Sequence, residues 1–167
     1  MSKIITYPDK ILRKKSKRVD NFNDPEIINL QNELIKTMLA EDGLGLAAPQ
    51  IGINFKITAI KLDNKATVFI NPQIIWKNWF NKQLVEEGCL SFPGIFGLVK
   101  RSKSVIIIYQ DNQGKYKLFK ASGLLATVFQ HEIDHLKGRL FIDKIVKYTK
   151  GEEITKKLIS QADDGER

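Results

Sequence analysis

The sequence contains only two histidines and one cysteine, and all three lie in short polar motifs. His131 and His135 belong to the stretch Gln130-His-Glu-Ile-Asp-His135, and Cys89 belongs to Glu86-Glu-Gly-Cys-Leu-Ser91. A separation of four residues is just over one helical turn, so the two imidazoles are expected on one face of a helix. A metal site of this kind needs a third protein ligand, and Cys89 is the best soft donor in the chain. We therefore expect a fold that brings Cys89 beside this helix.

The residues before the histidines predict that the helix is buried. Ser122 can cap it, the apolar residues that follow have helical spacing, and Gly138 ends it. A cluster of polar side chains on a buried face is costly unless something compensates it, and a metal ion would do so. The alternative is a surface helix that contains two unrelated histidines, which the apolar context argues against.

Glu132 stands between the two histidines, as in the H-E-x-x-H arrangement of zincin-like hydrolases. Its expected role is general base toward the attacking water, followed by proton delivery to the leaving amine. Burial should raise its pKa above that of a free carboxylate.

Cys89 alone has a simpler interpretation as a small buried residue. As a ligand, its thiolate and two imidazoles would leave one tetrahedral position open, and this chemistry alone predicts zinc.

The run Gly43-Leu-Gly-Leu-Ala-Ala-Pro-Gln-Ile-Gly52 is a loop of small residues. It lacks the Lys-Ser/Thr ending of a phosphate-binding loop. Gly45 would let the backbone lie against a ligand, and we count it with the catalytic residues. Gln50 is the only side chain in the run able to donate to a developing oxyanion.

The bulk composition is that of a globular chain. With 167 residues, 43% hydrophobic and 28% charged, residues 1–167 are expected to form a single catalytic domain. The apolar runs are too short to cross a bilayer, and the N-terminus does not resemble a secretory signal. A lone cysteine fits a reducing compartment, so we expect a cytoplasmic protein without membrane contact, while a processed organellar form stays open.

The formal net charge of +8 suggests attraction to a polyanion such as RNA or a ribosome surface. The plainer explanation is a composition rich in Lys, Ile and Asn. No nucleic-acid-binding motif accompanies the charge, so no specific DNA partner is expected.

The pattern along the chain predicts an α+β fold with mostly antiparallel sheets packed around a central helix that carries the two histidines. One N-terminal helix begins at Asp24-Pro25 and ends at Gly43, and a short C-terminal helix is expected at 152–160. Extended segments are expected at 55–62, 66–71, 73–79, 83–92, 98–109, 115–121 and 139–146, with a hairpin around Asp111-Asn-Gln-Gly114.

Three motifs together resemble the signatures of the peptide deformylase family. They are the loop 43–52, Glu87-Gly-Cys-Leu-Ser91 and Gln130-His-Glu-Ile-Asp-His-Leu-Lys-Gly138, in the family's order and approximate spacing. Tyr7-Pro-Asp-Lys-Ile-Leu-Arg13 resembles the family's N-terminus, so the similarity covers about 5 to 145. The resemblance implies an enzyme that removes the formyl group from the N-terminal formyl-methionine of nascent proteins and releases formate.

The resemblance also implies roles for single residues. It assigns the metal ligands to Cys89, His131 and His135 and the acid/base to Glu132. It assigns oxyanion stabilisation to the Gln50 side chain and the Leu90 backbone N–H. It implies one divalent metal ion, iron(II) in the native enzyme, which zinc, nickel or cobalt can replace. For the methionine side chain we expect an apolar pocket lined by Leu44, Val85, Leu124 and Val128.

The chain departs from the family in two places. Gly94-Ile-Phe-Gly97 stands where several bacterial relatives carry a substrate-facing arginine, and Thr127 stands where bulkier or basic residues are frequent. Transient ribosome contact through Lys144, Lys147, Lys150, Lys156 and Lys157 is a further hypothesis. Two other functions stay open: an ordinary H-E-x-x-H peptidase, and a basic ribosome- or RNA-binding protein with a degenerate site.

Overall fold

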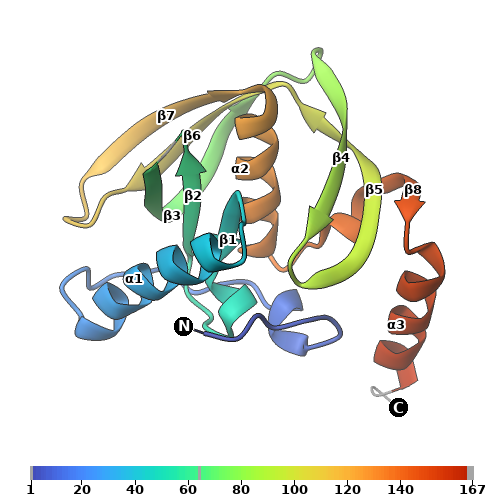
Figure 1. The fold of residues 1–167 in the computed structure, drawn as a ribbon. Helices are drawn as coiled ribbons and strands as arrows, with labels where there is room; N and C mark the ends of the chain where they lie inside the picture. Colours follow the sequence, from blue (N-terminus) through green and yellow to red (C-terminus); the bar gives the residue numbers. More distant parts are fainter. Residues whose placement is uncertain (1, 64, 165–167) are drawn as a thin grey trace.

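The computed structural model describes residues 2–63 and 65–164, and its fold is α+β with two antiparallel sheets (Figure 1). The larger sheet has the strand order β1-β2-β3-β6-β7 and is formed by Gly45–Ala47, Ile57–Leu62, Lys65–Lys77, Ser104–Gln110 and Tyr116–Ser122. The smaller sheet has the order β4-β5-β8 and is formed by Lys82–Cys89, Phe92–Ser102 and Ile145–Lys150. β1 and β4 are therefore edge strands.

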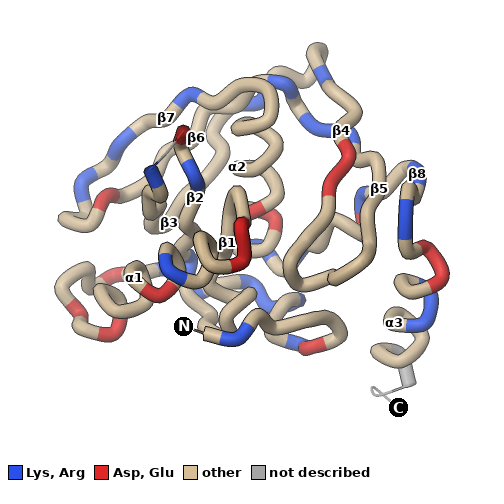
Figure 2. Tube along the Cα trace, in the orientation of Figure 1, with Lys and Arg blue, Asp and Glu red and all other residues tan. Residues whose placement is uncertain are grey.

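Three α-helices accompany the sheets: α1 (Pro25–Ala40), α2 (Gly123–His135) and α3 (Glu152–Asp164). Short 3-10 helices lie at Lys10–Arg13, Ala48–Ile51 and Phe141–Lys144. α2 stands between the two sheets and contacts strands of both (Figure 1), which fits the expected central helix. Basic residues are distributed over most of the fold (Figure 2). In the part of the chain that the structure describes, no helix is both long and apolar enough to span a membrane.

The helix boundaries follow local chemistry. Asp24 caps α1 by accepting a hydrogen bond from Glu26 N at 2.9 Å, and proline occupies the first helical position, as expected. At the other end, α1 stops at Ala40, before the expected Gly43, and Gly43 does not take the left-handed conformation that is common after a helix. Asp42 takes it instead, with φ of 50°, and the amide of Gly43 donates to the carbonyl of Met38 at 2.8 Å.

Several strand expectations were wrong in detail. The stretch 98–109 is two strands in different sheets, because β5 ends at Ser102 and β6 begins at Ser104. The stretches 66–71 and 73–79 are one strand, β3, which continues through Pro72 by means of irregular pairing with β6. The stretch 139–146 contains the 3-10 helix Phe141–Lys144, and β8 starts only at Ile145.

Candidate metal centre

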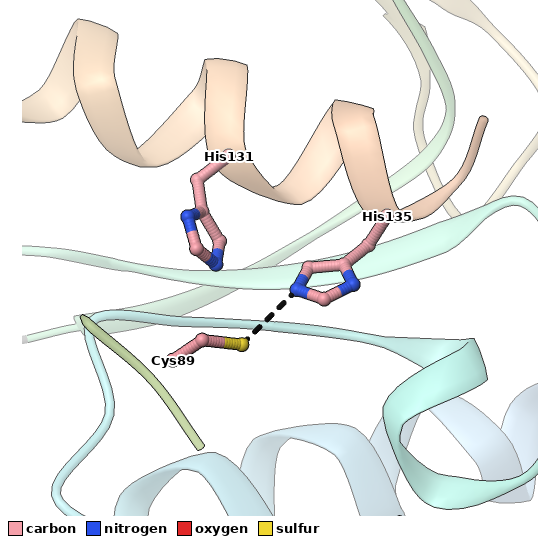
Figure 3. A group of neighbouring side chains, drawn as sticks. All are labelled: Cys89, His131 and His135. Carbon is pink, nitrogen blue, oxygen red and sulfur yellow. Dashed lines mark hydrogen bonds between the residues drawn. The ribbon is translucent and has the colours of Figure 1, made fainter. Parts of the chain in front are cut away.

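The only two histidines and the only cysteine converge at one point between the sheets (Figure 3). His131 and His135 project from the C-terminal half of α2, and Cys89 is the last residue of β4. One donor atom from each of the three lies within 4.8 Å of the other two, and Cys89 Sγ lies 3.3 Å from His135 Nε2. One sulfur and two imidazole nitrogens at this separation form a donor set suited to a first-row divalent metal ion.

A buried carboxylate orients the first histidine. Glu87 Oε2 lies 2.9 Å from His131 Nδ1, which leaves the Nε2 atom of that ring for a metal. Burial by itself would raise the pKa of Glu87, but hydrogen bonds from Arg101 and His131 lower that pKa to about 2. Glu87 is therefore ionised at neutral pH and holds His131 in one tautomer.

Glu87 is itself held in place by a network of buried charged side chains. Arg101 donates to both Glu87 oxygens, at 2.6 and 2.9 Å, and also binds Asp134, which Lys144 contacts from the other side. Glu87, Arg101 and Asp134 are buried. Sequence reasoning missed all of these roles. The available signal was position: Glu87 precedes Cys89 by two residues, and Asp134 lies inside the histidine motif.

Glu132 lies beside the three donor atoms in a dry environment. Its Oε2 atom is buried and has no hydrogen-bond partner, and burial raises the pKa of Glu132 to about 7, in the direction expected. The backbone at Gly45 approaches it so closely that a Cβ there would lie 2.6 Å from Glu132 Oε1. An unpartnered buried carboxylate next to soft donors fits a site built for a metal ion and a water molecule.

His135 is prepared for metal binding in a different way. Burial lowers the pKa of His135 well below its ordinary value, which favours the neutral ring, in which one nitrogen keeps a lone pair for a metal. Its Nδ1 atom is buried and has no partner in the described structure. The Nε2 atom is the one that faces Cys89 (Figure 3).

Gln50 points its amide nitrogen at the same site. The Ala47 backbone N–H donates to Gln50 Oε1 at 2.8 Å, and this fixes which end of the amide faces inward. Gln50 Nε2 lies 3.5 Å from Cys89 Sγ and 3.3 Å from Ser91 Oγ. The side chain is buried in the 3-10 helix that follows β1, so its donor is positioned before any ligand arrives.

A cavity of about 600 Å³ opens onto these groups. Leu44, Val85, Leu124 and Val128 all line it, as expected, and Leu44 and Leu124 are exposed at its rim. Its wall also includes Gly45, Gln50, Cys89, Leu90, His131 and Glu132. That the four apolar residues contact a methionine side chain stays a prediction.

The two departures noted in the sequence also lie at this cavity. Phe96, in the stretch Gly94-Ile-Phe-Gly97 that stands where several relatives carry an arginine, lines the cavity, and its ring packs so closely on Gly88 that a Cβ there would lie 2.6 Å from it. Thr127 lines the cavity too, and Gln83 donates to its hydroxyl at 3.0 Å. At these two positions the cavity wall therefore presents an aromatic ring and a hydroxyl group instead of a basic side chain.

Comparison with known proteins agrees with the geometry. The family model described as polypeptide deformylase matches residues 1–151. A peptide deformylase from Picosynechococcus sp. is 46% identical over 144 residues, covering 82% of this chain and 75% of that protein. Peptide deformylase 1 of Bacillus anthracis is 40% identical over 153 residues, covering 90% of this chain and 96% of the relative. The crystal structure of peptide deformylase from Thermotoga maritima is similar with a TM-score of 0.83 and 41% identity, covering 87% of this chain and 97% of that one. The chain thus belongs to the peptide deformylase family, metal-dependent hydrolases that remove the N-formyl group from nascent peptides.

Proposed function

We propose that this chain removes the formyl group from the N-terminal formyl-methionine of new proteins, with residues 1–167 acting as one catalytic domain. The observation that carries the proposal is the convergence of the donor atoms of Cys89, His131 and His135 within 4.8 Å of one another, beside the unpartnered carboxylate of Glu132. A cavity wide enough for a peptide end leads to them.

Cys89, His131 and His135 would hold one divalent metal ion. When bound, the ion would lower the pKa of a coordinated water and polarise the formyl carbonyl. We propose iron(II) as the native ion, replaceable by zinc, nickel or cobalt. Metal analysis of protein purified without oxygen tests the identity of the ion.

Glu132 accepts the proton of the attacking water in this mechanism. Its carboxylate is buried and has one oxygen free of partners, and its pKa is raised toward neutrality, which suits a group that takes and returns a proton at neutral pH. The proton then passes from Glu132 to the amide nitrogen, and formate leaves. Gly45 contributes by leaving room for this carboxylate.

The negative charge that develops on the formyl oxygen meets two donors of the chain. Gln50 presents its Nε2 atom, held in that orientation by the Ala47 amide. The backbone N–H of Leu90, in the turn directly after Cys89, is the second proposed donor. Removing one such donor costs roughly 10²–10³ in rate in enzymes that stabilise an oxyanion.

The substrate is proposed to bind as an extended strand. β1 and β4 are edge strands of separate sheets, and both contribute residues to the cavity, Gly45 from one and Val85 from the other. A peptide lying between them can satisfy its backbone hydrogen bonds on either side. The apolar side chains of Leu44, Val85, Leu124 and Val128 are available for the methionine side chain.

One assay tests the proposal. Metal-loaded protein, prepared anaerobically, is incubated with formyl-Met-Ala-Ser, and formate is measured. Release of formate with one metal ion per chain supports the proposal, and absence of formate at that metal content refutes it. Cleavage of the peptide bonds of an unformylated peptide would indicate an ordinary peptidase instead. Binding of RNA without either reaction would indicate a degenerate site.

We also propose the cellular compartment in which the protein acts. Cys89 as a free thiolate ligand requires a reducing compartment, which favours the cytoplasm. A relative from rice, 43% identical over 148 residues, is named as chloroplastic, so an organellar location is the alternative. Ribosome contact through Lys144 and the basic residues of β8 and α3 remains part of the proposal, but Lys144 binds Asp134 and is the least available of them.

A further inference from the structure

Phe96 lines the substrate cavity although it belongs to the second strand of the smaller sheet. β4 is the edge strand that borders the cavity, and Phe96 lies on β5, where it pairs with Gly88 of β4. The ring lies over Gly88, because a Cβ at that position would be 2.6 Å from Phe96 Cε1 and 2.8 Å from its Cδ1. Gly88 thus leaves the space through which an aromatic ring of β5 comes to line the cavity.

The ring of Phe96 lies on the face of the smaller sheet that points away from α2. Glu87 of β4 points toward α2, where it contacts His131. Side chains alternate along a strand, so position 88 is on the opposite face, and its cross-strand partner Phe96 shares that face. Phe96 is 39% exposed, so its ring has apolar surface available to a ligand.

A formylated peptide would bring its second residue to this ring. This step rests on the proposed function, in which the formyl group lies at the donor atoms around Cys89 and the peptide lies along β4. Cys89 is the last residue of β4, so such a peptide runs back along the strand past Gly88. Its methionine side chain points toward α2, on the side where Val85 and Val128 line the cavity. The next side chain of an extended peptide then points to the opposite face, which is the face of Phe96.

We propose that Phe96 is a specificity-determining residue, which binds the side chain directly after formyl-methionine and favours a large apolar or aromatic residue there. An aromatic ring that lies over a glycine offers its surface to such a side chain, and contacts between aromatic rings are favourable. The charged neighbours do not set the preference, because they have opposite signs. Glu86 precedes Gly88 by two residues, and Lys150 of β8 pairs with Phe96 from the other side.

A comparison of substrates tests the preference. Metal-loaded enzyme is given formyl-Met-Phe-Ser or formyl-Met-Ser-Ser, and kcat/KM is obtained from formate release. We call the quotient of the two values the selectivity ratio, and we expect it to be about five to ten. The difference should appear in KM, because the contact is made equally in the bound substrate and in the transition state. Both peptides are measured on one preparation, so the ratio does not depend on the fraction of folded or metal-loaded protein.

Variants of Phe96 assign the preference to the ring. Phe96→Ala should lower the selectivity ratio nearly to one, and Phe96→Leu should retain part of it, since leucine keeps an apolar contact. Leu84→Ala is the matched control, because Leu84 is an exposed apolar residue on the same face of β4 but is not part of the cavity wall. This control should have the selectivity ratio of the unmodified chain.

Gly88→Ala tests the same geometry from the other strand. Gly88 does not have a positive φ, so alanine fits the backbone, but its methyl group would collide with the ring of Phe96. The ring must then move out of its place in the cavity wall. The selectivity ratio should therefore fall toward that of Phe96→Ala.

The failure of this inference is distinguishable from the failure of the proposed function. Formate release with equal kcat/KM for the two peptides would overturn the inference and leave the proposed function intact. An unchanged selectivity ratio in Phe96→Ala would do the same. Absence of formate from both peptides, at one metal ion per chain, would refute the proposed function and this inference with it.

Discussion

Gly45 and Glu132 are in such close contact that a Cβ at position 45 would lie 2.6 Å from Glu132 Oε1 and 2.7 Å from its Cγ. Gly45→Ala should therefore displace the carboxylate without removing it. We expect kcat to fall by about 10²-fold, because misplacing a catalytic group by ~1 Å has an effect of that size. The metal content should be unchanged, since the atoms nearest to the added methyl group all belong to Glu132 and none to a proposed ligand.

Gly43→Ala is the matched control for this prediction. A Cβ at position 43 would meet nothing closer than 3.3 Å, and the residue does not have a positive φ. It should lose much less activity than Gly45→Ala in the same formate assay. Equal losses in the two variants would mean that the loop as a whole, and not the space for Glu132, matters.

Glu132→Gln should separate metal binding from turnover. The amide keeps the size of the side chain but cannot accept the proton from the attacking water, so kcat should fall by roughly 10²–10⁴. Metal analysis should still find one ion per chain. If the variant turned over formyl-Met-Ala-Ser at more than about a tenth of the normal rate, another group would have to be the base.

Glu87→Gln tests the support behind His131. The neutral amide orients the imidazole less strongly, so metal affinity should fall about 10- to 100-fold in competition with a chelator. Arg101 would also lose the carboxylate that it binds through two nitrogens and would keep only Asp134, so the free energy of unfolding measured with urea should fall by up to about 3 kcal/mol.

A second substitution separates these two effects. Adding Arg101→Met to Glu87→Gln removes the buried guanidinium that has lost Glu87, and Asp134 keeps its contact with Lys144, so part of the lost stability should return. Metal affinity should not return, because His131 still lacks its carboxylate. Recovery of both quantities together would show that Glu87 acts only through overall stability.

The parts of the site that could be predicted from sequence are those fixed by local spacing. His131 and His135 share a helix face because they are four residues apart, and Glu132 follows from its place between them. Cys89 was assignable because the chain offers no other thiol. By contrast, the contact of Arg101 with Glu87 depends on the pairing of β4 with β5, in which Gln83 lies opposite Arg101. No local pattern encodes that register.

The fold shows the same division. The start of α1 follows from Asp24 and proline, both local signals, and was predicted correctly. The separation of β5 from β6 was missed because residues 98–109 read as one extended run. Only tertiary contacts assign Val99 to the smaller sheet and Val105 to the larger one. Pro72 similarly suggested a break, yet β3 tolerates it at an irregularity in its pairing with β6.

Removal of the metal should change stability as well as activity, and Cys89 should control both. An ion that binds only the folded chain stabilises it by about 2.7 kcal/mol at a free concentration 100 times its dissociation constant. Chelation should therefore lower the Tm of the normal chain and abolish formate release, and returning the ion should restore both. Cys89→Ala should show the lower Tm from the start and fail to respond to added ion, because only His131 and His135 remain as donors. A Cys89→Ala protein that still gained stability from stoichiometric metal would remove the cysteine from the proposed ligand set.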